Sequence, residues 1–284
     1  MDNRVYLAGC EDYGKENVEN AVKRALLAFN LPNIKGKKVL IKANLLSANN
    51  PNKAVTTHPE VVAAIAREFI KANNEVTIAD SPAGLYNQGV MGKVYSSCGM
   101  KRASEESGAM LNFDMTHKHV NFPQGKYAKD ANNISPAWDA DLIINVAKLK
   151  THGLSYYTGA VKNLFGVIPG LEKASFHSLY PDKYKFNGVL VDICEYIKPE
   201  ISFVDGIIGM EGAGPSGGKA KHVGVIGASL NPYALDLAMS DLVSLPKSKI
   251  PILVEATKRG LVAEDVGKLE FLGDDPLKFK TSFQ

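Results

Sequence analysis

The sequence is poor in cysteine, in net charge and in long apolar runs. Its 284 residues include three cysteines, Cys10, Cys98 and Cys194, which lie far apart and form no C-x-x-C pair. Disulfide frameworks and cysteine-rich metal sites need more thiols, so we expect a protein of the reducing cytoplasm. The formal net charge of +3 is too small to indicate a nucleic-acid or membrane partner. No apolar run approaches the roughly 20 residues of a membrane span.

Strand and helix patterns alternate along most of the chain, whose composition (45% hydrophobic, 22% charged) is ordinary for a globular protein. Predicted strands span 5–8, 39–41, 76–79, 142–147, 201–204 and 223–226. Predicted helices span 15–29, 59–70, 187–197 and 232–243. Helices of this length between strands favour right-handed crossovers and an α/β fold, a mostly parallel, doubly wound sheet with helices on both faces. We expect a single domain with an irregular insertion at about 85–138, which includes an edge hairpin around 117–122.

Basic and polar residues follow the apolar run 142–147, in the order Lys148, Lys150, His152, Lys162 and Asn163. Ligands collect beyond the carboxyl ends of buried parallel strands. A packed core needs none of these groups, and leaving them unpaired costs several kcal/mol each. The segment therefore predicts a ligand or cofactor site, and a basic solvated loop is the alternative.

Other predicted strands also end in polar side chains. Lys42 and Asn44 follow the strand 39–41, Asp80 follows 76–79, and Asp205 follows 201–204. We expect these residues to gather in one cleft at the carboxyl edge of the sheet, although polar residues are common in any loop. His58 is a further candidate ligand residue, and an ordinary helix cap before Pro59 is the alternative for it.

The segment 206–218 is rich in glycine. Gly212, Gly214 and Gly217 satisfy G-x-G-x-x-G, but a strand follows instead of the helix that a dinucleotide site requires. A Walker A loop is excluded as well, because Ala220 stands where Ser or Thr is needed. We interpret the segment as a flexible loop whose backbone N–H groups form an anion nest, or as a lid over the site, with Gly212, Gly214 and Glu211 as ligand-binding candidates and a plain surface turn as the alternative.

Two histidines, His152 and His177, lie on either side of Lys162 in the sequence. Imidazole can bind a metal or move a proton near neutral pH, and a lysine in a desolvated pocket can act as a nucleophile or base. His117 and His119 alternate in the irregular region, where we expect them to face solvent, with joint binding of a metal on one strand face as the alternative.

Six motifs together resemble the family called domain of unknown function 362. They are K-x-N at 42–44, T-H-P at 57–59, D-S-P at 80–82, K-T-H-G at 150–153, G-A-V-K-N-L-F-G at 159–166 and D-G-I-x-G-M-E-G-x-G-P at 205–215. The resemblance extends to about residue 245. Many relatives carry a ferredoxin-like module with two four-iron four-sulfur clusters after this domain, which implies a redox setting and a redox partner protein. This chain has no cysteine after Cys194, so we expect no iron-sulfur cluster in it.

The segment 155–162 with Pro169-Gly170 is similar to the part of nickel-pincer lactate racemase whose lysine tethers the cofactor. In that enzyme a histidine lies ten residues before the lysine, and a metal-ligating histidine lies about sixteen after it. Here His152 lies ten before Lys162 and His177 fifteen after. The resemblance implies that Lys162 anchors a cofactor, His177 ligates a metal and His152 is the acid or base. The racemase has an arginine where Thr57-His58-Pro59 stands here.

The sequence therefore predicts a site for an anionic small molecule or an organic cofactor, without fixing the cofactor or the metal. Lys42, Lys148, Lys150 and Lys162 would supply positive charge, and Asn44 and Asn163 would orient the ligand. Asp80, Asp205 or Glu211 would supply a carboxylate for proton transfer or metal binding. We favour an enzyme over a non-catalytic binding module, and a scaffold that docks a redox partner is the third alternative.

Overall fold

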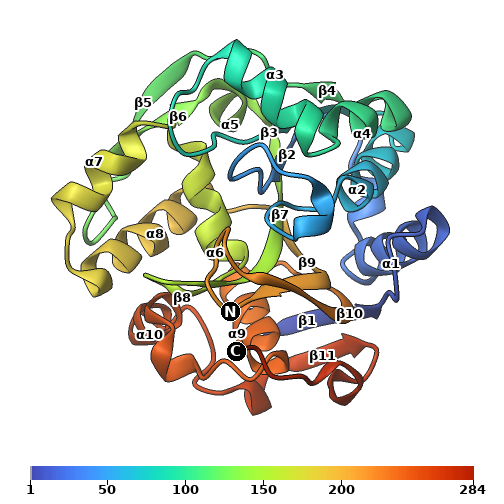
Figure 1. Ribbon diagram of the computed structural model, residues 1–284, viewed down its shortest axis with the longest axis vertical. Coiled ribbons are helices and arrows are strands. Elements are labelled where there is room, and N and C mark those ends of the chain that lie inside the picture. Colours follow the sequence, from blue (N-terminus) through green and yellow to red (C-terminus); the bar gives the residue numbers. More distant parts are fainter. Residues whose placement is uncertain (1) are drawn as a thin grey trace.

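A nine-stranded sheet runs through the computed structural model, which describes residues 2–284 with the side chain of Pro32 excepted (Figure 1). In spatial order its strands are β11 (Glu270–Gly273), β1 (Arg4–Gly9), β10 (Lys219–Ser229), β9 (Ile201–Glu211), β7 (Leu142–His152), β2 (Lys38–Ala43), β3 (Glu75–Ala79) and β4 (Met110–Leu111), and β8 (Tyr156–Thr158) pairs with β7. β10 is antiparallel to both neighbours and β8 to β7, whereas the remaining pairings are parallel. The expectation of a mostly parallel sheet is confirmed.

Helices cover both faces of the sheet, as predicted. One face packs against α1 (Lys15–Ala28), α2 (Pro59–Lys71), α3 (Gln88–Ser97) and α4 (Met100–Ser107); the other packs against α6 (Ala160–Asn163), α8 (Lys183–Ile197), α9 (Pro232–Leu242) and α10 (Pro251–Lys258). Strand side chains alternate between the two cores: Val5 and Leu7 lie in one, Tyr6 and Ala8 in the other. Short 3₁₀ turns are η1 (Leu31–Asn33), η2 (Pro51–Lys53), η3 (Leu164–Val167), η4 (Lys247–Lys249), η5 (Val266–Lys268) and η6 (Pro276–Phe279).

The segment 85–138, expected to be irregular, contains more regular structure than the sequence pattern indicates. It holds α3, α4, β4, the short helix α5 (Ser135–Asp139) and a separate hairpin of β5 (His117–Asn121) and β6 (Asp130–Ile134). The hairpin lies where the sequence suggested one. The two helices escaped prediction because each buries three residues: Met91, Val94 and Tyr95 in α3, and Met100, Ala103 and Ser107 in α4.

Asp192, on α8, holds one side of the fold together. Its carboxylate accepts hydrogen bonds from the backbone N–H groups of Lys126, Tyr127 and Ala128 at 2.9, 2.7 and 2.9 Å. It also pairs with Arg259 at 2.6 Å, and the Asp192 side chain is fully buried. This contact joins the turn 126–128 and the segment after α10 to α8.

We predict that Asp192→Ala lowers the free energy of unfolding by about 3–5 kcal/mol, the usual cost of leaving a buried ionic partner uncompensated. Urea denaturation would measure it. The control is Asp182→Ala, which removes the exposed cap that accepts from the backbone of Tyr184 and Lys185 on the same helix and should cost about 1 kcal/mol. Equal losses in the two variants would contradict this account.

Candidate functional site

A cavity of about 400 Å³ lies where β2, β3 and β7 end, and α6, η3 and α7 (Glu172–Leu179) complete its walls. Its apolar lining includes Leu46, Pro82, Phe165 and Leu171. The polar residues that line it are Asn44, Asp80, Ser81, His152, Lys162, Asn163, Lys173 and His177. Six of these eight were singled out in the sequence, so the structure brings a large part of the expected set to one place.

A buried ion pair lies beneath this cavity. Lys42 Nζ is 2.7 Å from Asp80 Oδ1, and the Lys42 side chain has no exposed surface. Asp80 also accepts hydrogen bonds from the backbone N–H groups of Leu45 (2.6 Å) and Ser81 (2.8 Å). A Cβ at Gly166 would lie 2.0 Å from Asp80 Oδ1 and 2.4 Å from Lys42 Nζ, so the pair requires a glycine above it. Burial lowers the pKa of Lys42, against the opposing effect of Asp80.

A row of asparagine side chains connects a second buried lysine, Lys150, to the region of the Lys42–Asp80 pair. Lys150 Nζ donates to Asn44 Oδ1 and to the carbonyl of Val55, both at 2.7 Å. Asn44 Nδ2 donates to Asn163 Oδ1 (3.1 Å), and Asn163 Nδ2 donates to Asn145 Oδ1 (2.8 Å). Burial, with Lys162 and Lys148 nearby, lowers the pKa of Lys150 to about 7. Asn44 and Asn163 are therefore held in position by hydrogen bonds within the protein, without a ligand.

Lys162 reaches the cavity from α6, whose first turn is held by Asp236 on α9. The Asp236 carboxylate accepts from the backbone N–H groups of Ala160 (2.6 Å) and Val161 (3.0 Å), and burial raises its pKa to about 7. Within residues 2–284, no hydrogen bond or ion pair joins Lys162 Nζ to another residue; the Phe165 ring centroid lies 5.8 Å away. Burial lowers the pKa of Lys162 to about 8.

His152 is held in one tautomer. Its Nδ1 accepts hydrogen bonds from the backbone N–H groups of Leu154 (3.1 Å) and Ser155 (3.2 Å), so the neutral ring carries its proton on Nε2. Burial, Lys162 and Lys150 lower the pKa of His152 to about 3. The ring therefore stays neutral at physiological pH and offers an Nε2–H donor.

His177, the predicted metal ligand, lies on α7 and lines the same cavity as Lys162. Its ring stacks on Phe186 with centroids 4.2 Å apart and meets Phe165 edge-on at 6.2 Å. Burial and Lys162 lower its pKa. The turn at Pro169-Gly170 folds α7 back over the cavity, where a Cβ at Gly170 would lie 2.0 Å from the carbonyl oxygen of Gly84.

Sequence reasoning missed Lys173 and Ser81 as lining residues. Lys173 Nζ, on α7, donates to the carbonyls of Ser81 and Pro82, and burial lowers its pKa to about 7. The Ser81 hydroxyl is buried and has no hydrogen-bond partner in the described part of the chain. The D-S-P motif could have drawn attention to Ser81, but nothing in the local pattern distinguishes Lys173 from a surface lysine.

Lys148, Asp205 and His58 form a separate cluster that does not line the cavity. Lys148 Nζ pairs with Asp205 Oδ2 at 2.9 Å, and Tyr13 OH bonds to both residues. The lysine lies within β7 and the aspartate within β9, because both strands continue beyond their predicted ends. The His58 ring stacks on Tyr13 at 3.6 Å, and its Nδ1 accepts from the N–H of Glu60, the helix-cap arrangement.

The glycine-rich loop also lies apart from the cavity lining. Glu211 pairs with Lys221 at 3.0 Å, and the Gly212 N–H donates to the carbonyl of Gln284. Gly214 packs so closely on β7 that a Cβ there would lie 2.1 Å from the Thr151 carbonyl oxygen. Among residues 2–284, no group of three or more His, Cys, Asp and Glu could hold a metal ion. No helix in that range is long and apolar enough to cross a membrane.

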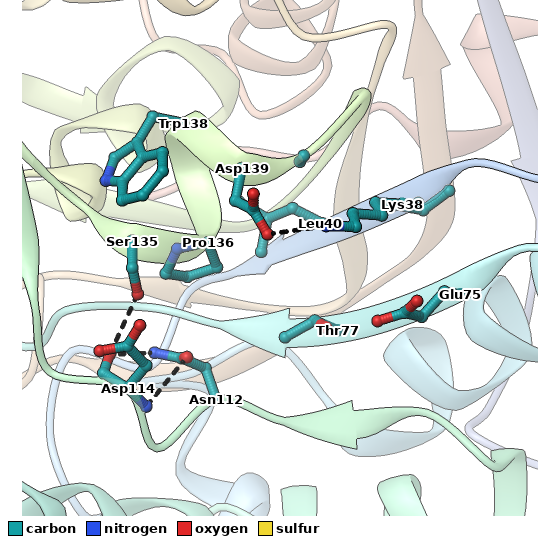
Figure 2. A pocket seen from close by; sticks show the side chains of 12 residues that line it. Lys38, Leu40, Glu75, Thr77, Asn112, Asp114, Ser135, Pro136, Trp138 and Asp139 are labelled. Carbon is teal, nitrogen blue, oxygen red and sulfur yellow. Dashed lines mark hydrogen bonds and ion pairs between the residues drawn. The ribbon is translucent and has the colours of Figure 1, made fainter.

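A different cavity, of about 330 Å³, lies at the opposite edge, where β2 and β3 begin (Figure 2). Lys38, Glu75, Asp114 and Trp138 are among the residues that line it, and none of the predicted site residues does. Lys38 pairs there with Asp139 at 3.2 Å on the surface.

Comparisons with known proteins agree with the fold. Thylakoid-associated protein sll1697 of Synechocystis sp. is 36% identical over 234 residues, which cover 80% of this chain and 69% of that protein. The lactate racemase apoprotein from Thermoanaerobacterium thermosaccharolyticum superposes with a TM-score of 0.53 at 14% identity, over 86% of this chain and 58% of that one. That likeness shows a shared fold. The family described as domain of unknown function (DUF362) matches residues 39–241, and the chain belongs to it.

Proposed function

We propose that the cavity at the carboxyl edge of the sheet binds an anionic small molecule or the anionic part of an organic cofactor, as the ligand site of an enzyme. The observation that carries the proposal is an excess of positive charge at the cavity, which Lys162 and Lys173 line as half-buried side chains, with Lys150 fully buried outside its lining. Lys42 is matched by Asp80, whereas Lys150, Lys162 and Lys173 form no ion pair with a carboxylate in the structure described.

Uncompensated cations in a partly buried site are costly, because the attraction of water is lost and no protein charge replaces it. A bound carboxylate or phosphate would restore that attraction and raise the pKa values of Lys162 and Lys173. Asn44 and Asn163, already fixed by the row of asparagine side chains, would orient the ligand. A bound anion would thus supply the negative counter-charge that the protein does not give these lysines.

The combination of Lys162 with two histidines supports an enzyme more than a passive binding module. A plain anion receptor needs lysines and backbone donors, whereas a lysine with a lowered pKa beside a neutral imidazole can take part in chemistry. The proposal includes a reducing, cytoplasmic setting, which the three free, buried cysteines support.

We predict that phosphate or acetate raises the melting temperature, by an amount that corresponds to about 2.7 kcal/mol when the anion is at a hundred times its Kd. Lys162→Met should weaken anion binding about tenfold or more, since it removes one of the unpaired cations. Differential scanning fluorimetry over a range of anion concentrations would measure both. Lys23→Met, on the exposed side of α1, is the matched control and should respond like the wild type.

The melting temperature of Lys162→Met without ligand is the stability control for this experiment. It should equal or exceed that of the wild type, because replacing an unpaired, half-buried charge by an apolar side chain is neutral or stabilising. A large decrease, or an unchanged response to anions, would count against the proposed role of Lys162.

A second candidate is a metal enzyme with a cofactor tethered to Lys162. It is favoured by the position of His152, Lys162 and His177 around one cavity, together with the shared fold of the lactate racemase apoprotein. Lys162 has a free amine to anchor the group, and His177 has an imidazole to bind a metal such as nickel. Since the described residues provide no complete metal site, the cofactor would supply the other donors. Such a group would supply reversible removal of hydrogen from a substrate carbon.

Elemental analysis and intact mass measurement of protein purified without oxygen test this candidate. This candidate, unlike the anion site alone, requires about one equivalent of metal and a mass increase on Lys162 in the wild type, with the metal lost in His177→Ala. His119→Ala, in the exposed strand β5, should keep the metal. Protein with neither metal nor an adduct on Lys162 would contradict the candidate and leave the anion site unaffected.

A further inference from the structure

We infer that Lys162 is a nucleophilic amine, and that the ligand of the cavity is an anionic carbonyl compound which this amine binds as an imine. The inference deepens the proposed function and rests on it, because it assigns a substrate class to the same cavity. The observation behind it is that the neighbouring lysines have hydrogen-bond acceptors, whereas Lys162 has none among the described residues.

Each of the other lysines has its side-chain nitrogen held by hydrogen-bond acceptors. Lys42 is paired with Asp80, Lys150 donates to Asn44 Oδ1 and the Val55 carbonyl, and Lys173 donates to two backbone carbonyls. These contacts occupy the N–H groups of the three amines and tie each amine to a neighbouring part of the protein. Lys162 Nζ has none among the described residues, so its nitrogen lone pair is the one available for reaction.

Burial strengthens that availability. It lowers the pKa of Lys162 from 10.5 to about 8, which gives roughly two hundredfold more free amine at pH 7.5 than an ordinary lysine has. The amine is also well placed, because Asp236 fixes the first turn of α6 through two backbone hydrogen bonds. An amine that is held in place beside an apolar wall and is partly unprotonated near neutral pH is the arrangement that carbonyl addition requires.

His152 supplies the matching electrophilic group. Its Nδ1 is occupied by two backbone donors, and its Nε2–H has no acceptor in residues 2–284. A neutral imidazole in this tautomer can donate to a carbonyl oxygen and polarise it, as neutral histidine does in other active sites. Lys173, which lines the same cavity, would hold the anionic group of the same molecule, and that anion would favour its protonated form.

The reaction balances without a further reagent. The Lys162 nitrogen forms a bond to the carbonyl carbon as the C=O π bond opens, and a proton passes from nitrogen to that oxygen. The C–O bond of the resulting carbinolamine then breaks, the hydroxyl group leaves as water with the second proton of the nitrogen, and a C=N bond to Nζ remains. No oxidant or reductant takes part, and hydrolysis of the imine reverses each step.

Reductive trapping tests the inference on the wild-type protein. We expect pyruvate with sodium cyanoborohydride to label Lys162 at least about ten times more than Lys23, as measured by peptide mass spectrometry, since free amine is the reacting form. Acetone, which has the carbonyl but no charge, should label Lys162 at least about tenfold less than pyruvate does. Labelling spread evenly over surface lysines would overturn the inference.

Lys162→Arg separates this inference from the proposed function. Arginine keeps the positive charge but is not a nucleophile, so the variant should still be stabilised by phosphate and should lose the trapped adduct. Phosphate binding in the wild type without any adduct on Lys162 would overturn the imine and leave the anion site standing. An adduct that forms as readily with acetone, in protein that does not bind phosphate, would overturn both.

Discussion

The buried pair between Lys42 and Asp80 is the constraint on which the cavity depends. It joins the end of β2 to the end of β3, and Gly166 lies directly on it, so it also sets the depth of the turn that follows Lys162. Asp80 receives two backbone N–H groups in addition to the lysine. Its carboxylate is therefore committed to Lys42, and the lysines on the other walls are left without a counter-charge.

The elements around the Lys42–Asp80 pair differ in how firmly they are held. Asp236 and the row of asparagine side chains fix α6, Asn44 and Asn163 through hydrogen bonds from buried elements. α7, which carries Lys173 and His177, has no buried residue along its length. Elements with few buried contacts open most easily, so ligand entry is expected on the side of α7, while the Lys162 amine on α6 stays in place.

Sequence patterns predicted the alternation of strands and helices because hydrophobic periodicity is local. They placed Lys148 and Asp205 beyond strand ends, whereas the two residues lie inside β7 and β9 as each other's partners. That pairing spans 57 positions and leaves no local signal. Lys173 was missed for the same reason, since the fold of the Pro169-Gly170 turn brings it back to the cavity. His58 has its local role, a helix cap, which was the alternative that the sequence offered.

The central claim is that the cavity contains positive charge which an anion completes, and nuclear magnetic resonance titration of the lysine side chains tests it most directly. With its signal assigned through Lys162→Arg, Lys162 should titrate near pH 8 in the free protein. Phosphate should move that midpoint upward, because an anion favours the protonated amine. A midpoint near 10.5 that phosphate leaves unchanged would contradict the account.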